Sequence, residues 1–173
     1  MCQKWNKPLK YVKKFRVLFV CTGNICRSPT ADGVMRQLVR KAGLQERVDI
    51  DSAGTDDYHV SEAPDRRAQQ HARKRGYDLS FLRARQVNRQ DFSQFDLVLA
   101  MDHGHLKKLE RQCPPELRDR LKMFLDFAPG HEGADVPDPY YGGGEGFENV
   151  LDLVEAGCDG LVKHIETALA QPE

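Results

Sequence analysis

The chain has 173 residues, and its 26 Lys and Arg residues balance its 26 Asp and Glu residues, so the formal net charge is zero. This balance argues against a protein that binds nucleic acid or an anionic membrane through bulk positive charge. The length predicts one domain with its own core, and the hydrophobic share of 40% is typical of a globular rather than a disordered chain.

The first fourteen residues, MCQKWNKPLKYVKK, are basic and lack the apolar run of a secretory signal. No segment approaches the roughly 20 consecutive apolar residues that a membrane span needs. We therefore expect residues 1–14 to form an extension that contributes little to the fold, and residues 15–173 to form a single domain. The expected location is the cytoplasm.

Segments typical of strands and of helices alternate along the rest of the chain. Apolar runs predict strands at residues 16–20, 47–54, 95–102 and 121–128. Helical periodicity with start and stop residues predicts helices at residues 28–43, 64–76, 103–112 and, after an irregular segment at about 129–146, from Phe147 to Leu169. This alternation indicates an α/β fold with a parallel sheet and helices on both faces.

Five cysteines, at positions 2, 21, 26, 113 and 158, are scattered and odd in number. Such a set is not a disulfide framework, and it suits a reducing compartment in which a special cysteine is catalytic or redox-active. We expect no metal site, because Cys21 and Cys26 lack a second Cys or His pair at zinc-ligand spacing. His103 and His105, at a predicted helix start, are expected to face solvent.

The first predicted strand runs directly into the sequence Cys-Thr-Gly-Asn-Ile-Cys-Arg-Ser. Gly23 and Asn24 tolerate the positive φ that turns backbone N–H groups inward around an anion. Arg27 and the helix start at Ser28 add positive charge at the same point. A thiol in this setting ionises readily, so we expect a Cys21 thiolate facing a tetrahedral oxyanion. The segment predicts a cysteine nucleophile in a phosphate-binding loop.

The stretch VLFVCTGNICRSPTAD resembles the signature of the low-molecular-weight protein tyrosine phosphatases of bacterial type, and the likeness extends through FDLVLAMD and DPYYGG to about residue 168. The resemblance implies a three-layer α/β fold, with a four-stranded parallel sheet, helices on both faces and the phosphate-binding loop after the first strand. It also implies hydrolysis of phosphotyrosine and aryl phosphate monoesters through a phosphocysteine, with no metal or cofactor and with inorganic phosphate as product.

The same resemblance assigns roles to residues of this chain. Cys21 is the nucleophile, Arg27 holds the phosphate, and Asp138 in Val-Pro-Asp-Pro is the general acid. The rest of the phosphate-binding set is Thr22, Gly23, Asn24, Ile25, Cys26 and Ser28. The residues that brace the loop are Asn24, Ser28 and Ser52, and those that line the substrate cleft are Ile25, Tyr58, Tyr140 and Tyr141. Cys26 is a candidate for a reversible disulfide with Cys21 that protects the nucleophile from oxidation.

Two positions bear on how far the likeness holds. Ile25 stands where a branch of the family that acts on phosphoarginine carries Thr, so the hydrocarbon favours phosphotyrosine. Leu82, or Phe81 in another alignment, stands where many members carry a His that braces the loop, so we expect the bracing network to be shorter by one partner.

Three other functions fit parts of the pattern. A phosphoarginine phosphatase or an arsenate reductase shares the fold, but the reductase needs further cysteines near the first and does not require Asp-Pro-Tyr. A non-catalytic phosphotyrosine-binding module would have lost Cys21, Arg27 or Asp138, and all three are present. The expected partner is a phosphotyrosine protein, in the context of a tyrosine kinase.

Overall fold

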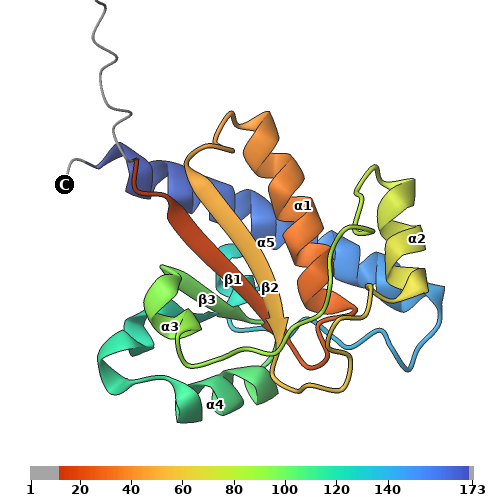
Figure 1. The fold of residues 1–173 in the computed structure, drawn as a ribbon. Coiled ribbons are helices and arrows are strands. Elements are labelled where there is room, and N and C mark those ends of the chain that lie inside the picture. Colours follow the sequence, from red (N-terminus) through yellow and green to blue (C-terminus); the bar gives the residue numbers. More distant parts are fainter. Residues whose placement is uncertain (1–11, 172–173) are drawn as a thin grey trace, which may run out of the picture.

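The computed structural model describes residues 12–171, which form a four-stranded parallel sheet with helices on both faces (Figure 1). The strands are β1 (Phe15–Cys21), β2 (Val48–Gly54), β3 (Leu97–Ala100) and β4 (Leu121–Met123), in the order β2-β1-β3-β4. The helices are α1 (Arg27–Lys41), α2 (Arg66–Lys74), α3 (Asp91–Gln94), α4 (His103–Gln112) and α5 (Gly144–Ala170). The predicted fold class is confirmed.

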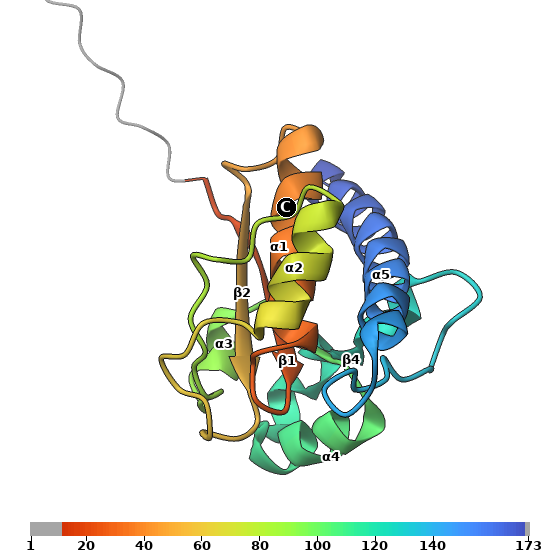
Figure 2. The same cartoon turned by 90° about the vertical axis from the view of Figure 1, so that its right-hand side faces the viewer.

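Side chains of β1 alternate between two hydrophobic clusters, as the pleat of a strand requires. Val17 and Phe19 belong to the cluster under α1 and α5, whereas Leu18 and Val20 belong to the cluster on the α3 and α4 face. Figure 2 shows α1 and α5 on one side of the sheet and α3 on the other. The sheet is therefore buried on both faces, and β1 lies near its centre.

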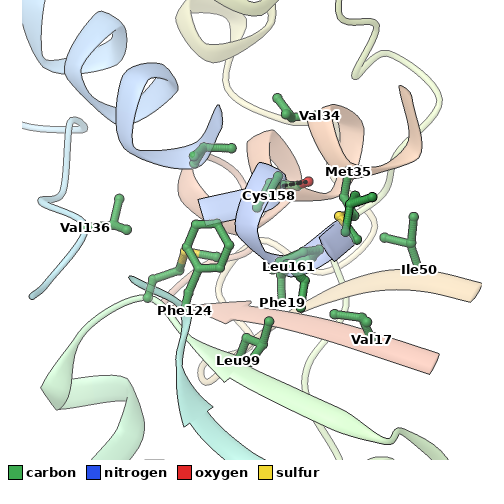
Figure 3. Close-up of a cluster of buried hydrophobic side chains, with 14 of the residues drawn as sticks. Val17, Phe19, Val34, Met35, Ile50, Leu99, Phe124, Val136, Cys158 and Leu161 are labelled. Carbon is green, nitrogen blue, oxygen red and sulfur yellow. Dashed lines mark hydrogen bonds between the residues drawn. The ribbon is translucent and has the colours of Figure 1, made fainter. Parts of the chain in front are cut away.

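The larger cluster joins the sheet to α5 (Figure 3). Phe19 and Phe124 meet edge to face, with ring centroids 5.4 Å apart and an interplanar angle of 89°. The Cys158 thiol lies in the same core and is 3.8 Å from the Ala31 carbonyl oxygen of α1. Cys158 is thus a buried packing residue between α1 and α5.

The strand order places a topological switch point beside β1. The chain passes from β1 to β2 on one side and then crosses to β3 on the other, so the segments that follow β1 and β3 diverge. Open parallel sheets bind ligands in the crevice that such divergence leaves at the carboxyl ends of the strands. Cys21 is the last residue of β1 and pairs in register with Gly54, the last residue of β2.

Three features of the fold differ from the sequence-based expectations. The predicted strand at 121–128 ends at Met123, and a 3₁₀ helix, η2 (Phe124–Phe127), follows. Phe124 and Leu125 both enter the cluster under α5, which successive residues of a strand cannot do. The short helices α3 and η1 (Pro115–Arg120) were not predicted, and α5 begins at Gly144.

The predicted extension at residues 1–14 falls mostly outside the described residues. Within it, Lys14 donates a 3.0 Å hydrogen bond to the Asp49 carboxylate of β2, so at least this residue is tied to the sheet. No helix between residues 12 and 171 combines the length and apolar character needed to cross a membrane.

Candidate active site

The nucleophile predicted at Cys21 lies at the bottom of a loop that joins β1 to α1. Its sulfur is buried and stands 3.0 Å from the Ser28 hydroxyl in the first turn of α1. Asn24 Nδ2 donates to the same hydroxyl oxygen at 2.8 Å. The Ser28 hydroxyl has one proton and two acceptors within reach, the Cys21 sulfur and, at 3.3 Å, the Ala53 carbonyl oxygen. When the hydroxyl donates to the sulfur, the bond stabilises a thiolate.

Asn24 supplies the brace for this loop through all the polar atoms of its side chain. Its Nδ2 donates to Ser28 Oγ and, at 3.0 Å, to Ser52 Oγ, and its Oδ1 accepts the Arg85 backbone N–H at 3.0 Å. The Arg85 side chain is in turn held by carboxylates at Asp51 and Asp91. Sequence reasoning missed Arg85.

Each polar atom of the Asn24 side chain therefore has a hydrogen-bond partner, although no His stands at Leu82 or Phe81. Leu82 is buried in the hydrophobic cluster under α1 and α5, and Phe81 is exposed beneath the Arg36 guanidinium. Neither side chain takes part in the polar network around Asn24, whose third partner is instead the backbone of Arg85.

The loop geometry corrects the expected roles of its small residues. Asn24 has a φ of +56°, but Gly23 is not among the residues with positive φ. A Cβ at Gly23 would lie 2.8 Å from the half-buried His59 ring, which would have to move to accommodate it. At Gly54 a Cβ would lie 2.6 Å from the Thr22 carbonyl oxygen. The backbone at the end of β2 therefore packs directly against the backbone of the phosphate-binding loop.

Arg27 is buried, and its two terminal nitrogens are held unequally. Nη1 donates to Asp102 Oδ2 at 2.8 Å and to the Val136 carbonyl at 3.0 Å. Nη2 has only long contacts of 3.5 Å, to Asp138 Oδ2 and to His105 Nε2. One nitrogen thus fixes the guanidinium, while the other is left to take a stronger acceptor such as a phosphate oxygen.

His105 does not face solvent, so that expectation was wrong, whereas the His103 side chain is exposed. Asp102 caps α4 by accepting the His105 backbone N–H at 2.8 Å, and this cap turns the first helical turn toward the crevice. There His105 Nε2 lies 2.7 Å from the Thr22 hydroxyl. Burial, with the nearby Arg27 charge, lowers the pKa of His105 from 6.5 to about 4, so the imidazole is neutral.

The protonated nitrogen of His105 follows from its neighbours. Arg27 Nη2 can only donate, so Nε2, which faces it and the Thr22 hydroxyl, is assigned as the acceptor. The proton then sits on Nδ1, which is buried 3.2 Å from Asp102 Oδ1 but is not aligned for a hydrogen bond to it. Burial alone would raise the pKa of Asp102, but hydrogen bonds from the His105 backbone and from Arg27 hold it below its ordinary value.

Asp138, Tyr140 and Tyr141 reach the same crevice from the segment before α5, and Tyr58 reaches it from the loop after β2. Asp138 Oδ1 accepts the Tyr140 backbone N–H at 2.9 Å, and Oδ2 points toward Arg27. These groups share one cavity of about 250 Å³. The residues that line it are Cys21, Thr22, Gly23, Ile25, Cys26, Arg27, Tyr58, His59, Asp138, Tyr140 and Tyr141.

The structure thus gathers the residues predicted from sequence in two layers. The candidates for the nucleophile, the phosphate arginine, the acid and the aromatic walls line the cavity. Asn24, Ser28 and Ser52 do not line it, and Asn24 hydrogen bonds to both serines. His59 lines the cavity as well, although its sequence context, Tyr-His-Val, gave no chemical reason to select it.

Cys26 lines the cavity and also belongs to a small apolar cluster with Ala68 and Phe147. Burial, followed by the negative charges of Asp65, Cys21 and Asp138, raises the pKa of the Cys26 thiol to about 12. Both Cys21 and Cys26 are free thiols in this structure. The protective disulfide between them stays a prediction.

A larger hollow of about 460 Å³ lies elsewhere, near the amino-terminal part of β1 and the C-terminal part of α1. Its lining includes Arg16, Arg36, Arg40 and Asp49, but no cysteine and no residue of the phosphate-binding loop. The larger cavity is therefore not the candidate active site, because Cys21, Arg27 and Asp138 line the smaller one.

Comparisons with known proteins identify the family. A family profile described as low molecular weight phosphotyrosine protein phosphatase matches residues 16–171. A low molecular weight protein-tyrosine-phosphatase of Streptomyces coelicolor is 49% identical over 152 residues, which cover 86% of this chain and 92% of that protein. A putative low molecular weight protein-tyrosine-phosphatase of Synechocystis is 45% identical over 148 residues, which cover 85% and 94%.

Solved structures agree with the sequence matches. Bacillus subtilis YfkJ superposes with a TM-score of 0.86 at 37% identity, covering 93% of this chain and 99% of that one. A protein tyrosine phosphatase of Entamoeba histolytica gives the same TM-score and identity, with 90% and 99% covered. With sequence, fold and the strand–loop–helix around Cys21 in agreement, this chain belongs to the low molecular weight phosphotyrosine protein phosphatase family.

Proposed function

We propose that this chain is a protein tyrosine phosphatase that hydrolyses phosphotyrosine, and aryl phosphate monoesters in general, through a phosphocysteine at Cys21 and without a metal. The observation that carries the proposal is the shared cavity of Cys21, Arg27 and Asp138, which places a nucleophile, an anion-binding cation and an acid around one space. Family membership supports the same activity.

In the first step the Cys21 thiolate attacks phosphorus, forming an S–P bond as the bond from phosphorus to the tyrosine oxygen breaks. Arg27 Nη2 and the backbone N–H groups of residues 22–27 hold the equatorial oxygens while charge redistributes. Asp138, as the neutral acid, gives its proton to the leaving phenolate oxygen. The Ser28 hydroxyl, 3.0 Å from the sulfur, steadies the thiolate before the attack.

In the second step water replaces the sulfur on phosphorus. Asp138, now a carboxylate, takes a proton from this water, an oxygen–phosphorus bond forms, and the S–P bond breaks to return the Cys21 thiolate. Inorganic phosphate is the product. Its release leaves Arg27 Nη2 again beside Asp138 and His105, as in the structure described above.

The walls of the cavity support an aromatic substrate. Tyr58, Tyr140 and Tyr141 line its mouth, and Ile25 adds hydrocarbon beside the loop. Phenyl rings stack well on such side chains. Among the structural relatives, Vibrio vulnificus Wzb, 27% identical with a TM-score of 0.75, was solved in complex with benzylphosphonate. We infer a phosphotyrosine protein as substrate, in a cytoplasmic setting that includes a tyrosine kinase.

Arsenate reduction is not favoured by the positions of the other described cysteines. Cys113 and Cys158 are each buried in one of the two hydrophobic clusters, on opposite faces of the sheet. A thiol relay needs cysteines that can reach the first sulfur, and burial raises the pKa of both, which keeps them as unreactive thiols.

The test is hydrolysis of p-nitrophenyl phosphate and of a phosphotyrosine peptide in the presence of EDTA. The proposal expects activity that is lost in Cys21→Ser. Asp138→Asn should lower kcat/KM most for the substrate with the poorer leaving group, by about 10²–10⁴-fold. A requirement for added metal, or reduction of arsenate without phosphatase activity, would overturn the proposal.

A further inference from the structure

The start of α2 touches both loops that carry the proposed chemistry. The Asp65 backbone N–H donates to the Ile25 carbonyl of the phosphate-binding loop at 2.8 Å. Two residues later, Arg67 Nη1 donates to the Tyr140 carbonyl of the segment that carries Asp138, at 3.2 Å. A single helical turn therefore connects the loop of the nucleophile to the loop of the acid.

Arg67 is itself held in a defined orientation. Asp65, the N-cap of α2, accepts the Arg67 backbone N–H at 2.8 Å and the side-chain Nε and Nη2 at 3.1 and 3.0 Å. The guanidinium lies over the rings of Tyr140 and Phe147, 5.3 and 5.0 Å from their centroids. With Nε and Nη2 taken by Asp65, Nη1 is the nitrogen that reaches the acid loop.

The helix that carries Arg67 is anchored at its other end. Arg75, just after α2, donates to Asp152 at 2.8 Å and to Glu155 at 3.0 Å, and it also pairs with Glu148. All three carboxylates belong to α5. Figure 1 shows α2 lying beside the first half of this long helix. Arg67 thus belongs to a helix whose other end is anchored to α5 by salt bridges.

Tyr140 connects Arg67 to the candidate acid, Asp138. Its N–H is bonded to Asp138 Oδ1 at 2.9 Å, and its carbonyl accepts the bond from Arg67, so one residue is held from both of its peptide groups. Asp138 has a direct contact with the phosphate-binding residues, but this contact, to Arg27 Nη2, is long at 3.5 Å. Arg27 must also turn this nitrogen to the phosphate when substrate binds.

We propose that Arg67 is a positioning residue that fixes Asp138 over the leaving group by holding the Tyr140 carbonyl, an inference that rests on the proposed phosphatase function. Once Arg27 Nη2 engages phosphate, the acid loop is still held before Asp138, where the Val136 carbonyl accepts from Arg27 Nη1 at 3.0 Å, and the bond from Arg67 to Tyr140 holds it after Asp138. Loss of this bond leaves the nucleophile and the phosphate cradle intact but displaces the proton donor.

The experiment compares kcat/KM for two substrates, because this ratio reports the step in which the leaving group departs. A phosphotyrosine peptide needs the acid, whereas 2,4-dinitrophenyl phosphate releases a stable anion without protonation. Arg67→Met should lower kcat/KM for the peptide by about tenfold or more, within the range that a positioned acid supplies, and change it less than about threefold for the dinitrophenyl ester. Arg67→Lys, which keeps the charge without the planar fork, should resemble Arg67→Met.

Arg66→Met is the matched control, because it removes the same charge from an exposed side chain one residue away. Arg66→Met should leave kcat/KM unchanged for both the phosphotyrosine peptide and the dinitrophenyl ester. In an Asp138→Asn background, Arg67→Met should add no further loss for the peptide, since the group through which it acts is already gone. Equal losses on both substrates, full additivity with Asp138→Asn, or an equal effect of Arg66→Met would each overturn the proposal.

This outcome is separable from failure of the proposed function. If the unmodified protein lacks phosphatase activity in EDTA, or if Cys21→Ser retains it, the proposed function fails before Arg67 is tested. If the activity is present and lost in Cys21→Ser, the substrate pattern of Arg67→Met decides this inference alone. Thermal unfolding of each variant checks that the fold persists.

Discussion

Lowering the pH from 7 to 4.5 should destabilise this protein through His105. Burial and Arg27 lower its pKa in the folded protein to about 4, against 6.5 for the ordinary side chain. As the pH falls below 6.5, the unfolded chain takes up the proton first, so the free energy of unfolding decreases and continues to decrease until about pH 4. At pH 4.5 the difference amounts to about 2 kcal/mol at 1.36 kcal/mol per unit of pKa.

The charges around His105 come from three parts of the fold. Arg27 of α1 and Lys108 of α4 disfavour the imidazolium, while Asp102 and Asp138 favour it, and burial is the largest influence. Of these carboxylates, Asp102 has a pKa held below 3.8, so its own loss of stabilisation falls at more acidic pH than the window tested.

Urea unfolding at pH 7 and pH 4.5 measures the effect, with His105→Gln as the comparison. Groups that titrate equally in the two proteins cancel in the difference between them. The unmodified protein should lose about 2 kcal/mol more than His105→Gln between the two pH values. If both proteins lose the same free energy, His105 is not the buried neutral group that its contact with Thr22 indicates.

Three further substitutions test separate parts of the structure. Phe124→Ala removes a fully buried ring from its edge contact with Phe19 and should reduce the free energy of unfolding by about 3–5 kcal/mol in urea titrations. Gly54→Ala places a Cβ against the Thr22 carbonyl and should lower kcat/KM for p-nitrophenyl phosphate by about 10²-fold, because the loop must move; unchanged kinetics would contradict the close approach. Ile25→Thr should raise phosphoarginine turnover relative to phosphotyrosine, and equal turnover of both by the unmodified protein would contradict the selectivity assigned to Ile25.

The parts of the site that sequence could predict are those built from neighbours in the chain. Cys21, Arg27 and Ser28 lie within one strand–loop–helix unit, and the chemistry of that unit is encoded in eight consecutive residues. The sheet and the major helices followed in the same way from alternating local patterns. The 3₁₀ helix η2 was missed because the apolar run at its start is compatible with a strand, and only the packing of Phe124 and Leu125 into one cluster decides against it.

The contacts that sequence could not predict join distant segments. His105 meets Thr22 across 83 positions, and the Arg85 backbone meets Asn24 across 61. Nothing in the local pattern of either segment shows which loop it will face. The composition of the loop permits positive φ at Gly23 or at Asn24, and only the structure shows that Asn24 adopts it.

Asn24 combines two demands that no other amino acid meets together, and this limits how the site can change in evolution. Its backbone needs a residue that tolerates φ of +56°, and its side chain must donate twice and accept once. Glycine keeps the backbone conformation and loses every side-chain bond, whereas aspartate cannot donate and brings a negative charge close to the Cys21 sulfur. A single substitution at this position is therefore a loss, because it leaves partners among Ser28, Ser52 and the Arg85 backbone N–H without their hydrogen bonds.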